Sequence, residues 1–195
     1  MIHNLLANKN VILASNSPRR IELLKMLGID FVSIPANIEE AHIDLSPKKF
    51  VVFYAQKKVE EISGLHKNAL IIGADTIVVI KNKILGKPVN KNQARDYLKL
   101  LSNNSHFVYT GIGLYYQGKI ITDFEKTRVI FQVLSDKDIE EYIKTNEPMD
   151  KAGAYGIQGF GSQFIKRIEG CYFNVMGFPI ALFYRMLKKY LIINR

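Results

Sequence analysis

The sequence predicts a mixed α/β fold in one continuous domain, residues 1–195. Two observations support this prediction: strand patterns alternate along the chain with segments of helical periodicity, and 48% of the 195 residues are apolar. A chain of this length and composition can bury one substantial core, or two closely joined lobes. No linker, internal repeat or low-complexity segment divides it.

Cap and proline signals locate the helices of the first half. Ser17 is a suitable N-cap, Pro18 suits the first helical position, and Gly28 suits the C-terminal stop. Ser46 and Pro47 repeat the signal. Runs of apolar and β-branched residues indicate the strands. The predicted elements are a strand at 11–14, a helix at 18–27, a strand at 31–35, a helix at 47–62 and a strand at 70–80.

Turn signals and alternating strands organise the second half. Residues 81–83 are a turn candidate, the pair Gln117-Gly118 joins two long strands, and Ser135 with Asp138 resembles a capping box. The predicted elements are a short strand at 84–85, a helix at 92–101, strands at 107–116 and 119–134, a helix that Ser135 opens and that runs through Ile143, a strand at 164–168 and a helix at 179–192.

A carboxylate stands in the middle of the most apolar strand. Asp75 lies within Leu-Ile-Ile-Gly-Ala-Asp-Thr-Ile-Val-Val-Ile, residues 70–80, a run typical of a buried central strand. An unpaired buried carboxylate is costly, so Asp75 needs a partner, a metal ion or a catalytic task. Gly73 indicates a bend or a close approach by a ligand. The alternative is a shorter strand, at whose end Asp75 caps a backbone group.

The first turn of the first predicted helix is basic, although helix starts favour acidic residues. Arg19 and Arg20 stand there, at the positive end of the helix dipole. Two guanidinium groups, free backbone N–H groups and the hydroxyls of Ser15 and Ser17 would together hold a phosphate or polyphosphate. We therefore expect an anion site, although the segment lacks the glycines of a Walker A motif. The alternative is a solvated arginine pair beside Glu22.

Three further segments carry candidate site residues. Lys87 is held between a glycine and a proline, which suits a fixed cation. Residues 147–161 include four glycines interleaved with charged and amide residues, which indicates backbone wrapped closely around something; the alternative is a flexible surface loop. The adjacent acids Glu39 and Glu40 gain a function only if they meet Asp75 across a metal ion.

Composition limits the class of protein. The net charge of +9 and the pI near 9.5 suggest an anionic partner, a nucleotide or a nucleic acid, although the lysines are spread along the chain. A single cysteine, Cys171, and four scattered histidines argue against a disulfide framework and against Cys or His metal sites. No secretory signal and no apolar run of about 18 residues is present. We therefore expect a cytoplasmic protein without a membrane partner.

Five motifs along the chain resemble the Maf family of nucleoside triphosphate pyrophosphatases, whose fold is similar to that of the inosine triphosphatases. The resemblance covers nearly the whole chain and implies a mixed twisted sheet flanked by helices, with two lobes around a central cleft. The five motifs are Ala14-Ser15-Asn16-Ser17-Pro18-Arg19-Arg20, Gly73-Ala74-Asp75-Thr76, Gly86-Lys87-Pro88, Glu147-Pro148-Met149-Asp150-Lys151-Ala152-Gly153 and Asn174-Val175-Met176-Gly177-Phe178-Pro179. Of these, the first and fourth are highly specific.

The resemblance implies hydrolysis of a nucleoside triphosphate between the α and β phosphates, with a divalent metal, Mg²⁺ or Mn²⁺. By this match Asp75 takes the role of the family's general-base or metal-binding aspartate. Glu40 would assist with the metal, and Glu39 is its substitute. The residues implied to face the phosphates are Ser15, Arg19, Arg20, Lys58 and Lys87.

Lys58 is preferred to Lys57 because residues 54–59 line up with a family Leu-Ala-x-x-Lys-Ala pattern, with departures at its first and last apolar positions.

The resemblance also bears on substrate choice. Residues 153–159 look like the branch acting on dTTP and UTP. In that branch the positions that bear on base selection match Arg19, Thr76 and Gln158. The Gln158 amide offers one donor and one acceptor, which can pair with the O4 and N3–H edge of uracil or thymine.

Other functions stay open at this point. A septum-formation regulatory protein that binds nucleic acid is one, but it would carry cations and stacking aromatic residues along one exposed face, whereas the notable cations here lie in loops. A Maf branch acting on methylated purine nucleotides and a triphosphatase releasing orthophosphate are two others. The oligomeric state is also open, a homodimer included.

Overall fold

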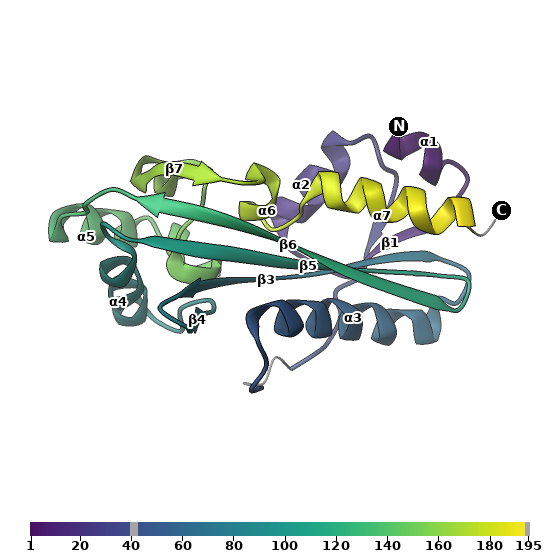
Figure 1. Cartoon of the computed structure of the whole chain (residues 1–195), viewed down its shortest axis with the longest axis horizontal. Coiled ribbons are helices and arrows are strands. Elements are labelled where there is room, and N and C mark those ends of the chain that lie inside the picture. Colours follow the sequence, from purple (N-terminus) through teal and green to yellow (C-terminus); the bar gives the residue numbers. More distant parts are fainter. Residues whose placement is uncertain (40–42, 194–195) are drawn as a thin grey trace. The chain divides into compact units, whose positions relative to one another are not determined.

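The structure, a computed structural model, describes residues 1–39 and 43–193. It confirms the mixed α/β fold, because a seven-stranded sheet combines parallel and antiparallel pairs and is flanked by helices (Figure 1). The strand order is β2-β1-β3-β5-β6-β7, with β4 paired to β3 off this path. The strands are β1 (Val11–Leu13), β2 (Val32–Ser33), β3 (Leu70–Ile80), β4 (Lys83–Leu85), β5 (Ser105–Tyr116), β6 (Lys119–Phe131) and β7 (Ile165–Glu169).

Helices connect these strands. The α-helices are α1 (Ile2–Leu6), α2 (Pro18–Met26), α3 (Pro47–Leu65), α4 (Lys91–Leu101), α5 (Asp136–Lys144), α6 (Tyr172–Val175) and α7 (Ile180–Ile193). Three 3-10 helices are η1 (Glu147–Asp150), η2 (Ala152–Ala154) and η3 (Gly159–Phe164). Within the part of the chain that is described, no helix combines the length and the apolar character needed to cross a membrane.

The chain forms two compact units. The first unit comprises Met1–Asp75, Thr110–Glu125 and Gly177–Arg195, and the second unit comprises Thr76–Tyr109 and Lys126–Met176. Three strands, β3, β5 and β6, contribute residues to both units. The single domain and the central cleft expected from the sequence stay predictions.

In the first unit, three glycines let α3 lie directly on the sheet. A Cβ added at Gly73 or Gly113 would lie 2.7 or 2.8 Å from the carbonyl oxygen of Ala55, and one at Gly111 would lie 2.2 Å from that of Val51. No side chain fits between the strands and the helix backbone at these points. Figure 1 shows α3 along one face of this part of the sheet and α7 along the other.

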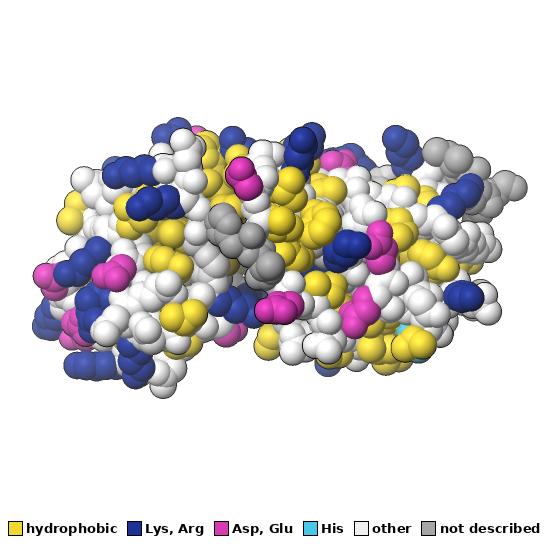
Figure 2. Space-filling view, turned by 90° about the horizontal axis from the view of Figure 1, so that it is seen from below, with side chains coloured by type: hydrophobic (Ala, Val, Ile, Leu, Met, Phe, Trp, Pro, Cys, Tyr) yellow, Lys and Arg dark blue, Asp and Glu magenta, His cyan; other side chains and the backbone are white. Residues whose placement is uncertain are grey.

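The core of the second unit contains a cluster of aromatic rings among aliphatic side chains. The rings of Phe131 and Tyr155 meet edge to face with centroids 4.7 Å apart, and the ring of Phe164 packs against that of Phe131. On the surface, a two-pronged ion pair between Arg95 and Glu140 joins α4 to α5. Figure 2 shows basic and acidic side chains intermixed where these two helices lie. Such exposed pairs contribute little stability, so the unit is stabilised mainly by its buried core.

A buried histidine belongs to this core. His106 Nε2 lies 2.7 Å from the hydroxyl oxygen of Tyr155, and Nδ1 has no hydrogen-bond partner among the described residues. Burial lowers the pKa of His106 to about 3, because the charged form would lose its hydration. His106 is therefore a neutral core side chain at physiological pH.

Most predicted elements are confirmed. β3 has the predicted bounds, Leu70–Ile80, and Lys81 and Asn82 form the predicted turn with φ angles of 47° and 63°. Ser135 and Asp138 form a capping box, with each side chain accepting a hydrogen bond from the other residue's backbone N–H. Apolar runs and capping signals thus located the long elements, although the side chains of Ser17 and Ser46 make no capping hydrogen bond at the starts of α2 and α3.

Several predictions differ from the structure. β2 has two residues where the sequence predicted a strand at 31–35, and β6 ends at Phe131, not at residue 134. Residues 147–161 are not a loop, because η1, η2 and the start of η3 occupy most of them. The sequence also failed to predict α1 and α6, since helices of five and four residues are too short for a period to be seen.

Candidate active site

Asp75 lies beside a lysine in the first unit. Its Oδ1 atom accepts a hydrogen bond from Lys58 Nζ at 2.6 Å, and the side chains of Lys58 and Asp75 are 13% and 6% exposed. The buried carboxylate therefore has the cationic partner that its burial requires.

The geometry of β3 and α3 decides which lysine reaches this carboxylate. Side chains alternate along a strand, so Asp75 points to the same face as Gly73, which α3 covers. Lys57 is 48% exposed and pairs with Glu60 at 3.0 Å. The lysine that lies beside Asp75 is thus Lys58, the one that matched the family pattern.

The Ser15 hydroxyl organises the segment between β1 and α2. Its oxygen accepts hydrogen bonds from the backbone N–H of Ser17 and from Arg20 Nη1, both at 3.2 Å, which leaves its O–H to act as a donor. Arg20 Nε also donates to the carbonyl oxygen of Gly177 at 3.0 Å. Arg19 is partly buried in the first turn of α2. The first and fifth motifs therefore meet in the first unit.

Strand register brings this segment alongside Asp75. β1 and β3 run parallel with Leu13 opposite Ile72, and the N–H of Ala14 donates to the Ile72 carbonyl at 2.8 Å. Residues that follow β1 therefore continue beside the stretch of β3 that ends at Asp75, at the usual spacing of about 4.8 Å between strands. Ser15 and Asp75 are both buried. The first unit thus collects a carboxylate, an ammonium, a guanidinium and a hydroxyl, a set suited to phosphate chemistry.

The third and fourth motifs meet in the second unit. The N–H of Gly153 donates to the carbonyl oxygen of Gly86 at 3.0 Å, next to the exposed Lys87. Gly153 has a φ of +70°, and a Cβ there would lie 2.9 Å from a valine side chain, so only glycine fits. Thr76 is half-buried and, as the next residue along β3, points to the opposite face from Asp75.

Glu147 holds the segment that carries Gln158. Its carboxylate accepts hydrogen bonds from the Tyr142 hydroxyl at 2.9 Å and from the backbone N–H groups of Phe160 and Gly161 at 2.9 and 3.1 Å. Burial and the negative charge of Glu147 raise the pKa of Tyr142, which keeps the phenol protonated as a donor. Half-buried Gln158 immediately precedes η3. Sequence reasoning gave Glu147 no role, because its donors become visible only in the fold.

The glycines of this segment wrap the backbone around protein side chains. A Cβ added at Gly159 would lie 2.6 Å from Glu147 Oε2, and one at Gly161 would lie 2.7 Å from the hydroxyl oxygen of Tyr142. The close wrapping predicted from the glycines is therefore present. The groups it encloses include Glu147 and Tyr142 of the chain itself.

The predicted metal ligands lie only partly within the described residues. Glu40 is outside them, and Glu39 is exposed. Across residues 1–39 and 43–193, no three His, Cys, Asp or Glu side chains gather as a metal site. Asp75 offers a buried carboxylate oxygen, and Mg²⁺ is commonly bound by one or two carboxylates together with substrate phosphates. Asp75 therefore fits a cation that binds together with a triphosphate.

Comparison with known proteins identifies the family. A family model described as Maf-like protein matches residues 10–190. The dTTP/UTP pyrophosphatase of Caldicellulosiruptor saccharolyticus is 48% identical over 188 residues, which cover 93% of this chain and 94% of that protein. A dTTP/UTP pyrophosphatase of Bacillus anthracis is 42% identical over 183 residues, covering 93% and 96%.

A crystal structure titled as a nucleoside-triphosphatase and dITP/XTP pyrophosphatase from Mycobacterium abscessus aligns with a TM-score of 0.40 and 11% identity. The alignment covers 63% of this chain and 74% of that chain, a likeness too weak to define the fold. The family model, in contrast, spans most of the sequence, and the two dTTP/UTP pyrophosphatases match over nearly their full lengths. The chain therefore belongs to the Maf family.

Proposed function

We propose that this protein is a nucleoside triphosphate pyrophosphatase that hydrolyses dTTP and UTP to the monophosphate and pyrophosphate. The observation that carries the proposal is the buried pair of Asp75 and Lys58, next to the segment of Ser15 and Arg20. The names of the two relatives, both dTTP/UTP pyrophosphatases, support the choice of substrate.

In the proposed reaction, water attacks the α-phosphorus of the bound nucleotide. A bond forms between the water oxygen and the α-phosphorus, the bond to the bridging oxygen breaks, and pyrophosphate leaves. Asp75 accepts the proton that the water loses. Lys58 and Arg20 compensate the charge that grows on the phosphate oxygens, and Ser15 donates a hydrogen bond to one of them. No covalent intermediate is required.

A divalent cation, Mg²⁺ or Mn²⁺, is part of the proposal. We assign it to Asp75 and Glu40. When bound, such an ion lowers the pKa of water and compensates phosphate charge. Lys58 has a separate task in the free protein, because its ammonium compensates the buried Asp75 carboxylate.

The remaining assignments follow the family match. Lys87 is proposed to bind phosphate, and Arg19, Thr76 and Gln158 are proposed to select the base. The hydrogen bonds from Phe160 and Gly161 to Glu147 support the assignment of Gln158, because they fix the backbone that follows it.

Incubation with a panel of nucleoside triphosphates tests the function. The pure protein, with Mg²⁺ or with Mn²⁺, is expected to release pyrophosphate from dTTP and UTP faster than from CTP, the purine nucleotides and methylated GTP. Faster release from methylated GTP would assign the chain to the purine branch, and orthophosphate as product would indicate a triphosphatase. Absence of turnover together with salt-dependent binding to DNA or RNA would favour the nucleic-acid-binding regulator.

Replacing Gln158 by alanine is expected to weaken base selection more than phosphate chemistry. The ratio of kcat/KM for UTP over CTP should fall by about 10- to 100-fold, the value of one or two specific hydrogen bonds. Gln163→Ala is the matched control, because Gln163 is an exposed amide in η3, the 3-10 helix that Gln158 immediately precedes. An equal loss on every nucleotide would remove Gln158 from base selection.

A further inference from the structure

Both oxygens of the Glu147 carboxylate are used to hold the backbone that follows Gln158. Oε1 accepts hydrogen bonds from the Tyr142 hydroxyl and from Gly161 N–H, and Oε2 accepts one from Phe160 N–H. The two backbone donors follow Gln158 by two and three residues. Hydrogen bonds to a charged acceptor are stronger than those between neutral groups. The carboxylate therefore fixes the chain on the C-terminal side of Gln158.

The Tyr142 hydroxyl holds the chain on the N-terminal side. It gives its proton to Glu147 and accepts a hydrogen bond from Gly156 N–H at 3.3 Å. Lys151 adds to this end, because it donates to the Glu147 carbonyl oxygen at 2.8 Å and a Cβ at Gly156 would lie 2.8 Å from its Cε. A Cβ at Gly161 would lie 2.6 Å from the Gly156 carbonyl oxygen, so the two ends of residues 156–161 are in contact.

Gln158 stands in the short stretch between these two ends. The next residue, Gly159, has a φ of +69°, and a Cβ there would lie 2.6 Å from Glu147 Oε2, so the chain passes directly over the carboxylate. Gln158 itself is extended, with φ and ψ of −102° and 162°. With the backbone held before and after it, Gln158 has a fixed Cα–Cβ direction. Such support by neighbouring groups is what keeps a recognition side chain in one geometry.

We propose that Glu147 is a positioning residue for base selection, which acts with the Tyr142 hydroxyl to hold residues 156–161 so that the Gln158 amide meets the base in one orientation. The inference rests on the proposed function, because it concerns the base that Gln158 selects. An amide separates uracil from cytosine only if its donor and acceptor stay in place, since the wrong base then leaves polar groups unpaired. A loosely held amide would adjust to either base.

The exchange Glu147→Gln tests the inference. Glutamine keeps the volume but has one acceptor oxygen, so its NH₂ group must face the Phe160 N–H or the donors on the other side. The ratio of kcat/KM for UTP over CTP is expected to fall at least about fivefold. The fall should come from a higher KM for UTP, with kcat within about threefold of the wild type. Pyrophosphate release at varied nucleotide concentrations gives both constants, and thermal unfolding reports on the fold.

A double variant separates positioning from general damage. In a Gln158→Ala background the group that Glu147 positions is absent, so adding Glu147→Gln should change the ratio for UTP over CTP by less than about twofold. Tyr142→Phe removes the shared hydroxyl but leaves the carboxylate on its two backbone donors. It should lower the ratio in the same direction but by less than Glu147→Gln.

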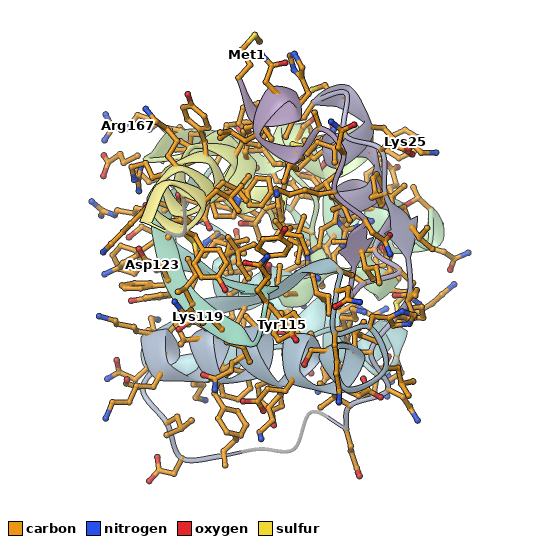
Figure 3. The ribbon with its side chains drawn as sticks, turned by 90° about the vertical axis from the view of Figure 1, so that its right-hand side faces the viewer. Met1, Lys25, Tyr115, Lys119, Asp123 and Arg167 are labelled. Atoms are coloured by element: carbon orange, nitrogen blue, oxygen red, sulfur yellow. The ribbon has the colours of Figure 1, made fainter. Side chains whose placement is uncertain are left out.

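Glu169→Gln is the matched control, because Glu169 is a carboxylate of the same unit that accepts hydrogen bonds at the surface. It pairs with Arg128 at 3.3 Å and with Arg167, and its side chain is 41% exposed. Figure 3 shows the Arg167 side chain extending outward from the ribbon. The variant should have the same ratio for UTP over CTP as the wild type.

The outcomes distinguish this inference from the proposed function. An unchanged ratio in folded Glu147→Gln, or a further fall of the ratio when Glu147→Gln is added to Gln158→Ala, would overturn the inference and leave the function intact. If Glu147→Gln fails to fold, an unchanged ratio in Tyr142→Phe would overturn it instead. A wild type that does not hydrolyse UTP, or does not prefer it to CTP, would overturn the proposed function and the inference with it.

Discussion

Asp75→Asn is expected to lower kcat/KM for dTTP and UTP by about three orders of magnitude, while the fold is largely preserved. The asparagine removes the proton acceptor and the negative charge of the proposed site. It keeps an oxygen that can accept the hydrogen bond from Lys58 Nζ, which now lies 2.6 Å from the carboxylate. Pyrophosphate release and thermal unfolding, measured on the same preparation, report the two effects separately.

A matched control for this change is Asp30→Asn, because Asp30 is an exposed carboxylate in the same unit. It should alter neither turnover nor thermal stability. If Asp75→Asn retained turnover close to that of the wild type, Asp75 would have no catalytic role. If Asp75→Asn failed to fold, the double variant Lys58→Met/Asp75→Asn would show whether the uncompensated ammonium of Lys58 is responsible.

Lys58→Met is expected to lower the free energy of unfolding by about 3–5 kcal/mol, because it leaves the buried Asp75 carboxylate without its ammonium partner. The double variant Lys58→Met/Asp75→Asn carries no buried charge at this position and should recover most of that stability. Its turnover should stay as low as that of Asp75→Asn. Urea unfolding gives the stability, and pyrophosphate release gives the activity.

Lys57→Met is the control for this pair, since Lys57 is half-exposed and its ion pair with Glu60 lies at the surface. The stability of Lys57→Met should remain within about 0.5 kcal/mol of the wild type. A stability of Lys58→Met equal to that of the wild type would show that the charge of Asp75 is compensated by some other group. A double variant as unstable as Lys58→Met would show that the lysine stem, and not its charge, supports the fold.

Local rules were enough to locate most of the elements and the central carboxylate. The aliphatic run around Asp75 gave β3 its correct bounds, and serine and proline signals placed the starts of α2 and α3. These features depend on neighbouring residues only. The cost of burial predicted that Asp75 needs a partner, a metal ion or a catalytic task. The family pattern singled out Lys58 over Lys57, but as a residue facing the phosphates, and its pairing with Asp75 became visible only in the fold.

Contacts between distant segments could not be predicted from local rules. Arg20 donates to the carbonyl of Gly177, which lies 157 residues further along the chain, and no spacing in the sequence indicates this bond. The acceptor role of Glu147 likewise depends on the turn that brings the N–H groups of Phe160 and Gly161 to one carboxylate. The pairing of β6 with β7 over Arg128–Phe131 also appears only in the strand register.

The three glycines beneath α3 have a consequence for how the protein tolerates change. At Gly73, Gly111 and Gly113 no side chain separates the strands from α3, so the helix backbone contacts the sheet directly. This contact sets the distance between the Lys58 ammonium and the Asp75 carboxylate. Close-packed interiors transmit displacement, so even one methyl group added two helical turns away would lift α3 and pull the ammonium from its acceptor. The geometry of the Lys58–Asp75 pair is thus sensitive to backbone positions beneath α3 that carry no side chain.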